Sequence, residues 1–293
     1  MKQNFAPFLV LLAAVLWGTT GTAQALAPDG VHPIAIGATR LAVGGLFLLT
    51  IILLTGKLQL KHWPLKRTFF AALSMAAYQP FFFTAVMMTG VAVGTVVAIG
   101  SAPILSGFIE WIFFKKRPQT IWWASTILSI IGCTLLFTNK ESVYTDPFGI
   151  VMALGAGLAF ASYTIISRDL VDYYSSLSVV AIVFTLSALL LVPFLFIFDM
   201  SWIMQTKGLI VSLHLGIVAT GIAYLLFASG LKFVPSSTAV TLALAEPLTA
   251  TLLGVFIVGE TLNVISFIGI LLLLIGLSML IFSARVKRMI KRV

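Results

Sequence analysis

Long runs of apolar residues, separated by short polar segments, occupy almost the whole chain. A helix needs about 20 apolar residues to cross the hydrocarbon core of a bilayer, and each run is close to that length. The pattern therefore predicts an all-α, polytopic membrane protein with ten transmembrane helices. The predicted spans are 6–27, 33–55, 67–88, 91–114, 119–138, 147–168, 177–198, 208–230, 234–258 and 262–284.

The composition supports this prediction. Of the 293 residues, 60% are hydrophobic and only 9% are charged, and the mean hydropathy is +1.12. A soluble domain of this length needs far more charge to cover its surface. The single cysteine, Cys133, cannot form an intrachain disulfide and is expected to be a small apolar filler of the fifth span.

Lysine and arginine are distributed unevenly among the connecting segments. If the N-terminus is cytoplasmic, all but three of the 18 fall on the cytoplasmic side; Lys140 and Lys207 fall in outside loops and Arg40 within a span. This asymmetry predicts a multi-pass protein of the cytoplasmic (inner) membrane with both termini in the cytoplasm. The net charge of +9 then reflects orientation and contact with the lipid bilayer, and no nucleic-acid partner is expected.

The second half of the chain repeats features of the first. A shift of 144 residues places Pro103 on Pro247 and Gly132 on Gly276, and it aligns the short links that follow the third and eighth spans. Each half has five spans, and because five is odd the halves must cross the membrane in opposite directions. Inverted repeats are typical of secondary transporters, which bind substrate near the membrane midplane between the halves.

Several short motifs are informative in combination: Leu16-Trp17-Gly18, Arg40-Leu41, Ala245-Glu246-Pro247 and the later Gly269 and Gly276. Together they resemble the EamA family of the drug/metabolite transporter (DMT) superfamily. The resemblance implies a basket in which spans 1–4 and 6–9 surround a central cavity, while spans 5 and 10 pack to the side. The chain departs from the family at Lys115-Lys116-Arg117, where the family often has Gly-Glu.

The repeats and the resemblance predict three parts of the chain. Residues 1–140 are expected to form the first five-helix repeat (EamA 1), and residues 145–285 the second (EamA 2). Residues 286–293 are expected to form a basic cytoplasmic tail.

Two prolines are expected to kink their spans. A proline removes one backbone hydrogen bond and pushes on the carbonyl four residues back, so Pro247 should free the carbonyl of Ala243 and Pro103 that of Ile99. A freed carbonyl in lipid is costly, so both kinks should face the protein interior. They could shape the basket wall, contact the substrate or act as hinges for alternating access.

Glu246 is an acid in the middle of a membrane span. Such a group is costly in lipid and usually faces a cavity or a partner. It could couple transport to protons or bind a cationic group. The structural alternative is a hydrogen-bonded acid that ties spans 9 and 4 together.

Three other polar residues lie in or near the spans. Arg40 could bind a substrate carboxylate through two hydrogen bonds, or snorkel to the outer interface. Glu110 is expected to form a local ion pair with Lys115 and Lys116. His214 is expected to be a hydrogen-bonded core residue, with a ligand or proton-relay role as the alternative.

Polar and aromatic residues recur at helical spacing in spans 1, 3, 6, 8 and 9. Facing inward, these stripes would form an apolar pocket with a few polar groups, as small-ligand sites do; otherwise they are packing. The predicted substrate-binding residues are Trp17, Thr20, Gln24, Arg40, Tyr78, Gln79, Phe82, Tyr163, Tyr224, Phe227 and Glu246. Small residues in spans 5 and 10 form faces that favour close helix packing, either as a scaffold or as a dimer contact.

No glycine-rich phosphate loop, metal-ligand spacing or serine–histidine arrangement is present in the sequence, so no ATP motor, cofactor, metal or enzyme is expected.

The sequence predicts a secondary transporter, in particular an exporter of small metabolites such as amino acids that works by alternating access. The alternatives are proton-coupled efflux of lipophilic or quaternary cations and, more remotely, a membrane-embedded lipid-modifying enzyme. Expected partners are a small-molecule substrate, the bilayer and, if Glu246 couples transport, protons. The protein is expected to be a monomer or a homodimer.

Overall fold

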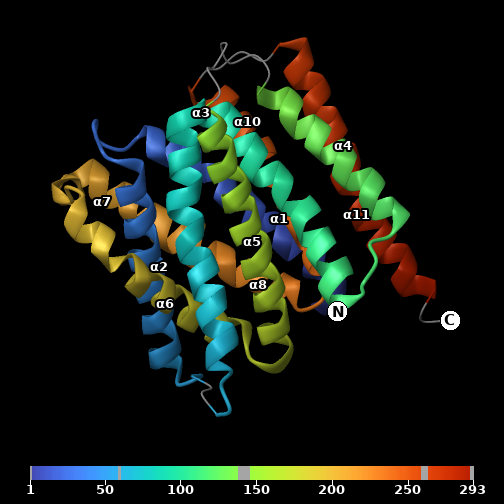
Figure 1. Cartoon of the computed structure of the whole chain (residues 1–293), viewed down its shortest axis with the longest axis horizontal. Coiled ribbons are helices and arrows are strands. Elements are labelled where there is room, and N and C mark those ends of the chain that lie inside the picture. The colour runs from blue at the N-terminus through green and yellow to red at the C-terminus, as the bar shows by residue number, and fades with distance from the viewer. Residues whose placement is uncertain (1, 59–60, 138–145, 259–262, 291–293) are drawn as a thin grey trace.

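A computed structural model of the chain describes residues 2–58, 61–137, 146–258 and 263–290 (Figure 1). Within these ranges all regular structure is helical. The elements are α1 (Lys2–Ala25), α2 (Pro33–Thr55), α3 (Leu65–Phe114), α4 (Thr120–Phe137), α5 (Pro147–Tyr173), α6 (Ser176–Ile197), η1 (Ser201–Met204), α7 (Thr206–Leu213), η2 (His214–Ile222), α8 (Ala223–Leu231), α9 (Ser236–Leu242), α10 (Ala245–Leu253), η3 (Gly254–Val258) and α11 (Val264–Ile290).

These elements provide the expected ten spans. In the described part of the chain, nine helices are long and apolar enough to cross a membrane, and Thr120–Leu136 is a shorter apolar helix. The element α3 holds two spans, Leu65–Gly90 and Val93–Phe114. They meet at Gly90, whose φ of 80° and ψ of 161° suit glycine.

Spans 8 and 9 depart from regular α-helix. Span 8 contains the π-helical segment η2 between α7 and α8, and span 9 is divided between α9 and α10. At that division the carbonyl of Ala243 accepts the N–H of Glu246 at 2.9 Å. The expectation that Pro247 frees this carbonyl is therefore wrong, because a shorter hydrogen bond replaces the one that proline cannot donate.

The two matched prolines differ in their effect on the backbone. The helix is interrupted just before Pro247, between Leu242 and Ala245, whereas α3 continues through Pro103. Within α3, the backbone leaves helical geometry at Gly90, away from Pro103. Span 9 therefore has the more marked discontinuity of the two.

The helices α4 and α11 form a pair at the edge of the molecule (Figure 1). Their small residues meet each other, since a Cβ on Gly132 would lie 2.6 Å from the backbone nitrogen of Leu273, and a Cβ on Gly276 would lie 2.3 Å from Ser129 Oγ. These small faces are thus occupied within one chain, which supports the scaffold interpretation. The basic side chains expected after residue 283 lie outside the described side chains.

Helices of the first half pack mainly against helices of the second half. The extensive contacts are those of α3 with α5, α2 with α6, and α1 with α8 and α10. Small residues permit these close approaches; a Cβ on Gly157 of α5 would lie 2.8 Å from the carbonyl oxygen of Ala98 in α3. The two halves therefore share one core, and a cavity lies inside it.

Candidate functional site

A small cavity of about 30 Å³ lies between helices of both halves. A water molecule needs roughly 10–15 Å³, whereas small-molecule sites usually measure about 300–1,000 Å³. The cavity therefore has room for water but not for a metabolite, and this conformation is closed around it. It is lined by Trp17, Arg40, Tyr78, Ala98, Ile99, Ala102, Phe160, Tyr224, Val240, Ala243 and Glu246.

Residues that correspond in the two halves meet at this cavity. Under the shift of 144 residues, Ile99 corresponds to Ala243, and Ala102 corresponds to Glu246. The cavity thus lies between the repeats, where secondary transporters bind their substrates. Because the residue that corresponds to Glu246 is an alanine, Ala102, only the second repeat carries this negative charge.

Arg40 is held at the cavity by span 8. It is only 8% exposed, its Nε donates to Thr220 Oγ1 at 3.1 Å and its Nη2 donates to the carbonyl of Ala219 at 3.3 Å. Both acceptors belong to the π-helical segment η2, and such segments are frequent at functional sites. The alternative that Arg40 snorkels to the outer interface is wrong, because its guanidinium is anchored inside the protein.

Glu246 lies in the first turn of α10, and its side chain is partly accessible from the cavity. Across the described residues it forms no ion pair with Arg40 within 4 Å and no hydrogen bond to α3. The carboxylate of Glu246 is therefore placed to contact a substrate or water in the cavity. The hydrogen bond that would tie span 9 to span 4 is not found among the described residues.

Gly18 allows α1 to lie against the backbone of Glu246. A Cβ at this position would lie 2.5 Å from Thr249 Cβ and 2.8 Å from the carbonyl oxygen of Glu246. Only glycine fits at that distance. The neighbouring Trp17 is consequently brought to the cavity wall.

Aromatic rings form the walls of the cavity. The ring of Trp17 lies 4.7 Å from Tyr224 and 5.8 Å from Phe160, measured between ring centroids, and Tyr78 lies 6.0 Å from Phe160. A second layer packs behind these rings. It consists of Phe82 at 5.5 Å from Tyr78, Tyr163 at 5.7 Å from Tyr224, and Phe227 at 5.2 Å from Trp17.

Five of the predicted binding residues line the cavity and six do not. Trp17, Arg40, Tyr78, Tyr224 and Glu246 line it. The second-layer rings Phe82, Tyr163 and Phe227 support the wall, and Thr20, Gln24 and Gln79 lie away from the lining. The buried Gln79 instead faces Gly37, whose Cβ would lie 3.1 Å from its Oε1.

The predicted binding residues did not include six that line the cavity: Phe160, Ala98, Ile99, Ala102, Val240 and Ala243. The internal repeat carried a signal for three of them. Phe160 corresponds to Trp17 under a shift of 143 residues, and Ile99 and Ala102 correspond to Ala243 and Glu246 under the shift of 144. The small residues carry no chemistry that would have marked them.

A wider opening of about 530 Å³ lies towards the ends of α3, α5 and α9. Glu110 lies here, and its carboxylate accepts the backbone N–H groups of Ser236 at 3.1 Å and Ser237 at 3.3 Å. The expected local ion pair of Glu110 with Lys115 and Lys116 is therefore wrong. The first N–H groups of a helix lack partners within it, so the N-terminus of α9 attracts this acid.

His214 is a partly buried, hydrogen-bonded residue. Its Nε2 lies 2.9 Å from Thr19 Oγ1, which itself donates to the carbonyl of Leu16 at 2.7 Å. His214 also begins η2, the segment that holds Arg40. The expected hydrogen bond is confirmed, and the residue is partly buried.

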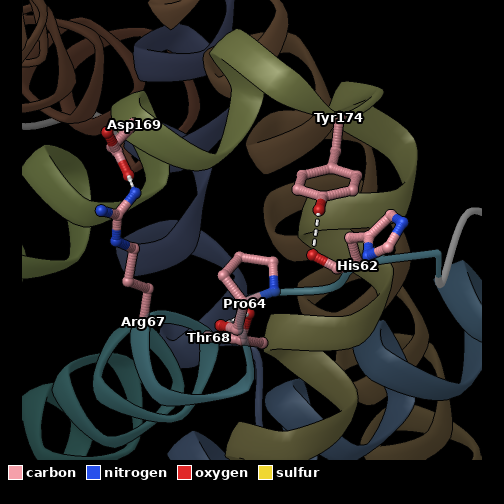
Figure 2. A network of polar contacts seen from close by, with 6 residues as sticks. All are labelled: His62, Pro64, Arg67, Thr68, Asp169 and Tyr174. Atoms are coloured by element: carbon pink, nitrogen blue, oxygen red, sulfur yellow. Dashed lines mark hydrogen bonds and ion pairs between the residues drawn. The ribbon is translucent and has the colours of Figure 1, made fainter.

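Polar contacts join the loop between α2 and α3, and the first turn of α3, to the end of α5 (Figure 2). Tyr174 OH donates to the carbonyl of His62 at 2.6 Å, and Arg67 forms an ion pair with Asp169. We call these two contacts the clasp. The clasp links the two halves beside the wider opening, because Asp169 also lines that opening.

Two helical halves that pack around a shared cavity are typical of membrane transporters. The chain belongs to the EamA-like transporter family, which matches residues 4–138 and again residues 147–282. Its fold is the ten-helix, two-repeat basket of the drug/metabolite transporter superfamily, and its family is one of transporters, not of enzymes.

Three known proteins illustrate the relationship. The chain is 51% identical over 284 residues to the uncharacterized transporter YwfM of Bacillus subtilis (strain 168), covering 97% of this chain and 95% of that protein. It is 26% identical over 274 residues to the threonine/homoserine exporter RhtA of Escherichia coli (strain K12), covering 90% and 87%. One crystal structure superposes with a TM-score of 0.83 at 21% identity, covering 96% of this chain and 97% of that one, which shows the fold.

Proposed function

We propose that this protein exports small zwitterionic metabolites, such as amino acids, across the cytoplasmic membrane. The observation that carries the proposal is that Arg40 and Glu246 line one cavity without pairing directly in the described part of the chain. A guanidinium binds a carboxylate through two hydrogen bonds. A carboxylate surrounded by aromatic rings suits an ammonium group.

The two hydrogen bonds of Arg40 to span 8 leave this recognition possible. A guanidinium has five N–H donors, and two of them go to Thr220 and Ala219. The remaining donors are available to a substrate carboxylate. The relative that carries the name threonine/homoserine exporter supports an amino acid as the substrate class.

Transport would proceed by alternating access between the two halves. Because the cavity measures only about 30 Å³, a substrate must enter through a conformation in which it is wider. The interruption between α9 and α10 is the proposed hinge, since it lies one residue from Glu246. The clasp and the bonds of Glu110 to α9 must break when the cavity opens towards the cytoplasm.

Proton coupling through Glu246 is part of the proposal. The acid lies in the cavity and has no fixed partner among the described residues, so it can exchange a proton when the substrate leaves. Protons moving inward would then drive export. The positive-inside distribution of Lys and Arg supports the orientation with both termini in the cytoplasm.

Efflux of lipophilic or quaternary cations is the second candidate. The rings of Trp17, Tyr78, Phe160 and Tyr224 surround Glu246, and aromatic walls around an acid also suit such cations. This function would not require Arg40 to meet the substrate.

Flux measurements in proteoliposomes test the proposal. The panel contains amino acids, carboxylates without an amine and choline-like cations, each with and without a pH gradient. We expect amino acids to be transported and the pH gradient to accelerate them. Transport of cations alone would replace the proposal by the second candidate, and flux of none of the panel would contradict both.

A further inference from the structure

An apolar groove of about 680 Å³ runs along α4 and α11, outside the central cavity. These two helices lie at the edge of the molecule (Figure 1), and several groove residues face outward; Leu274 is 45% exposed, Ile275 50% and Phe282 61%. The groove is lined by Gln119, Ile121, Leu271, Leu274, Ile275, Ser278, Met279, Phe282 and Ser283.

The groove is continuous with the polar opening near Glu110. Gln119, Ile121 and Ser283 line both of them. An occupant could therefore place a chain in the groove and a polar group in the opening. This shape matches an amphiphile and is larger than a free anion needs.

Lys116 and Arg117 supply positive charge at the polar end. Arg117 is positioned over the ring of Trp111, 5.3 Å from its centre, and tryptophan is typical of the membrane interface. In the part of the chain that the structure describes, neither cation has a carboxylate partner.

The carboxylates of the same opening already have partners. Glu110 accepts the amides of α9, Asp169 pairs with Arg67, and Asp172 lies 3.6 Å from Arg168. The charge left over at the mouth of the groove is therefore positive, which complements an anionic head group.

We propose that this groove binds an anionic phospholipid of the cytoplasmic leaflet. Its phosphate would lie on Lys116 and Arg117, and one acyl chain would lie along Ile275 and Phe282. Basic pockets beside cytoplasmic ends of helices suit anionic head groups, and a buried chain adds hydrophobic affinity. The proposal rests on the inward orientation of the α3–α4 loop, and it is independent of the substrate that the central cavity takes.

Native mass spectrometry of the detergent-purified full chain tests it. The titrants are phosphatidylglycerol, phosphatidylcholine and glycerol phosphate, the last of which carries the phosphate without acyl chains. We expect phosphatidylglycerol to bind more tightly than the other two. Equal binding of phosphatidylcholine would overturn the charge recognition, and equal binding of glycerol phosphate would overturn the role of the groove.

Two variants locate the site. Replacing Lys116 and Arg117 by glutamine should weaken phosphatidylglycerol binding about 30-fold, since each cation near an anionic lipid contributes about fivefold. The control replaces the exposed Lys61 and Lys66 by glutamine, which removes the same charge around the start of α3 and should change binding little. Equal losses in both double variants would overturn the assignment.

A second pair of variants tests the groove itself. Ile275→Trp fills it and should reduce phosphatidylglycerol binding at least fivefold, whereas Leu54→Trp, at an 82% exposed position of α2, should not. The same spectra report the number of chains per particle. A dimer that is lost in Ile275→Trp would show that a second copy occupies the groove and would overturn the lipid proposal.

Discussion

Two charged side chains distinguish the halves of an otherwise related cavity wall. Glu246 corresponds to Ala102 in the repeat, and Arg40 corresponds to Phe184. A device that moves its substrate in one direction needs such an asymmetry, because identical halves would treat both sides of the membrane alike. The structure places both charges at the cavity and anchors only Arg40 in hydrogen bonds to a neighbouring helix.

The charge of Glu246 is expected to set the pH dependence of transport. In the native protein, acidifying the outside should accelerate export, because protons then load onto the acid from that side. Glu246→Gln cannot exchange a proton, so its transport rate should no longer depend on the outside pH. Proteoliposome flux at several outside pH values measures this, with folding checked by thermal unfolding; an unchanged pH profile would remove the coupling.

At the scale of elements, close contacts between small residues position the site. Gly18 lets α1 touch α10 beside Glu246, and Gly44 lets α2 approach η2, where its Cβ would lie 2.8 Å from the carbonyl oxygen of Gly216. Both contacts bring a cavity residue into place: Trp17 through α1 and Arg40 through α2. Substitutions at these glycines should therefore displace cavity residues, although neither glycine lines the cavity itself.

Gly18→Ala tests this with a control in the same helix. The added methyl group collides with Thr249 and with the Glu246 carbonyl, and overpacking of this kind costs about 1–3 kcal/mol. We expect a lower unfolding temperature and a loss of transport. Gly21→Ala meets nothing within 4 Å, so it should leave transport intact. Equal effects of the two substitutions would show that the contact with α10 is unimportant.

The amino-acid sequence predicted the spans well and their internal breaks poorly. The bilayer dictates the length of an apolar run, and the run 33–55 coincides with α2, Pro33–Thr55. The π-helical η2 has no comparable signal in the sequence. Its contact is with Arg40, about 180 residues earlier in the chain, and local sequence patterns do not show such a distant contact. The partner of Glu110 was missed for the same reason, since local charges suggested Lys115 while the fold supplies the distant end of α9.

At the scale of the whole molecule, the two halves are joined at one end by the clasp. Each of its contacts is individually weak: an exposed ion pair contributes roughly 0.2–1 kcal/mol and a hydrogen bond roughly 0.5–1.5 kcal/mol. Together they contribute about 1–2 kcal/mol, a factor of about 5–30 in the ratio of closed to open forms. The clasp can therefore stabilise the closed form and still release it during each cycle.

Breaking the clasp should open the cavity towards the cytoplasm. In a Cys133→Ala background, Ala98→Cys places a thiol at the cavity wall, where labelling by a water-soluble maleimide in inside-out vesicles reports access. Arg67→Gln with Tyr174→Phe should raise the labelling rate about 5–30-fold. The neighbouring exposed Lys66→Gln serves as the control and should not raise it. Equal rates in all three proteins would contradict a role of the clasp in closure.

The central claim is that one cavity recognises both charges of a zwitterion, with Arg40 binding the carboxylate. The most direct measurement compares proteoliposome uptake of an amino acid with uptake of its decarboxylated amine, in the native protein and in Arg40→Gln. We predict that uptake of the amino acid falls tenfold or more in the variant, because the loss of a bidentate charged contact costs more than about 1.4 kcal/mol. Uptake of the amine should fall far less. Equal loss of both compounds would contradict the account and make Arg40 a structural residue held by Thr220 and Ala219.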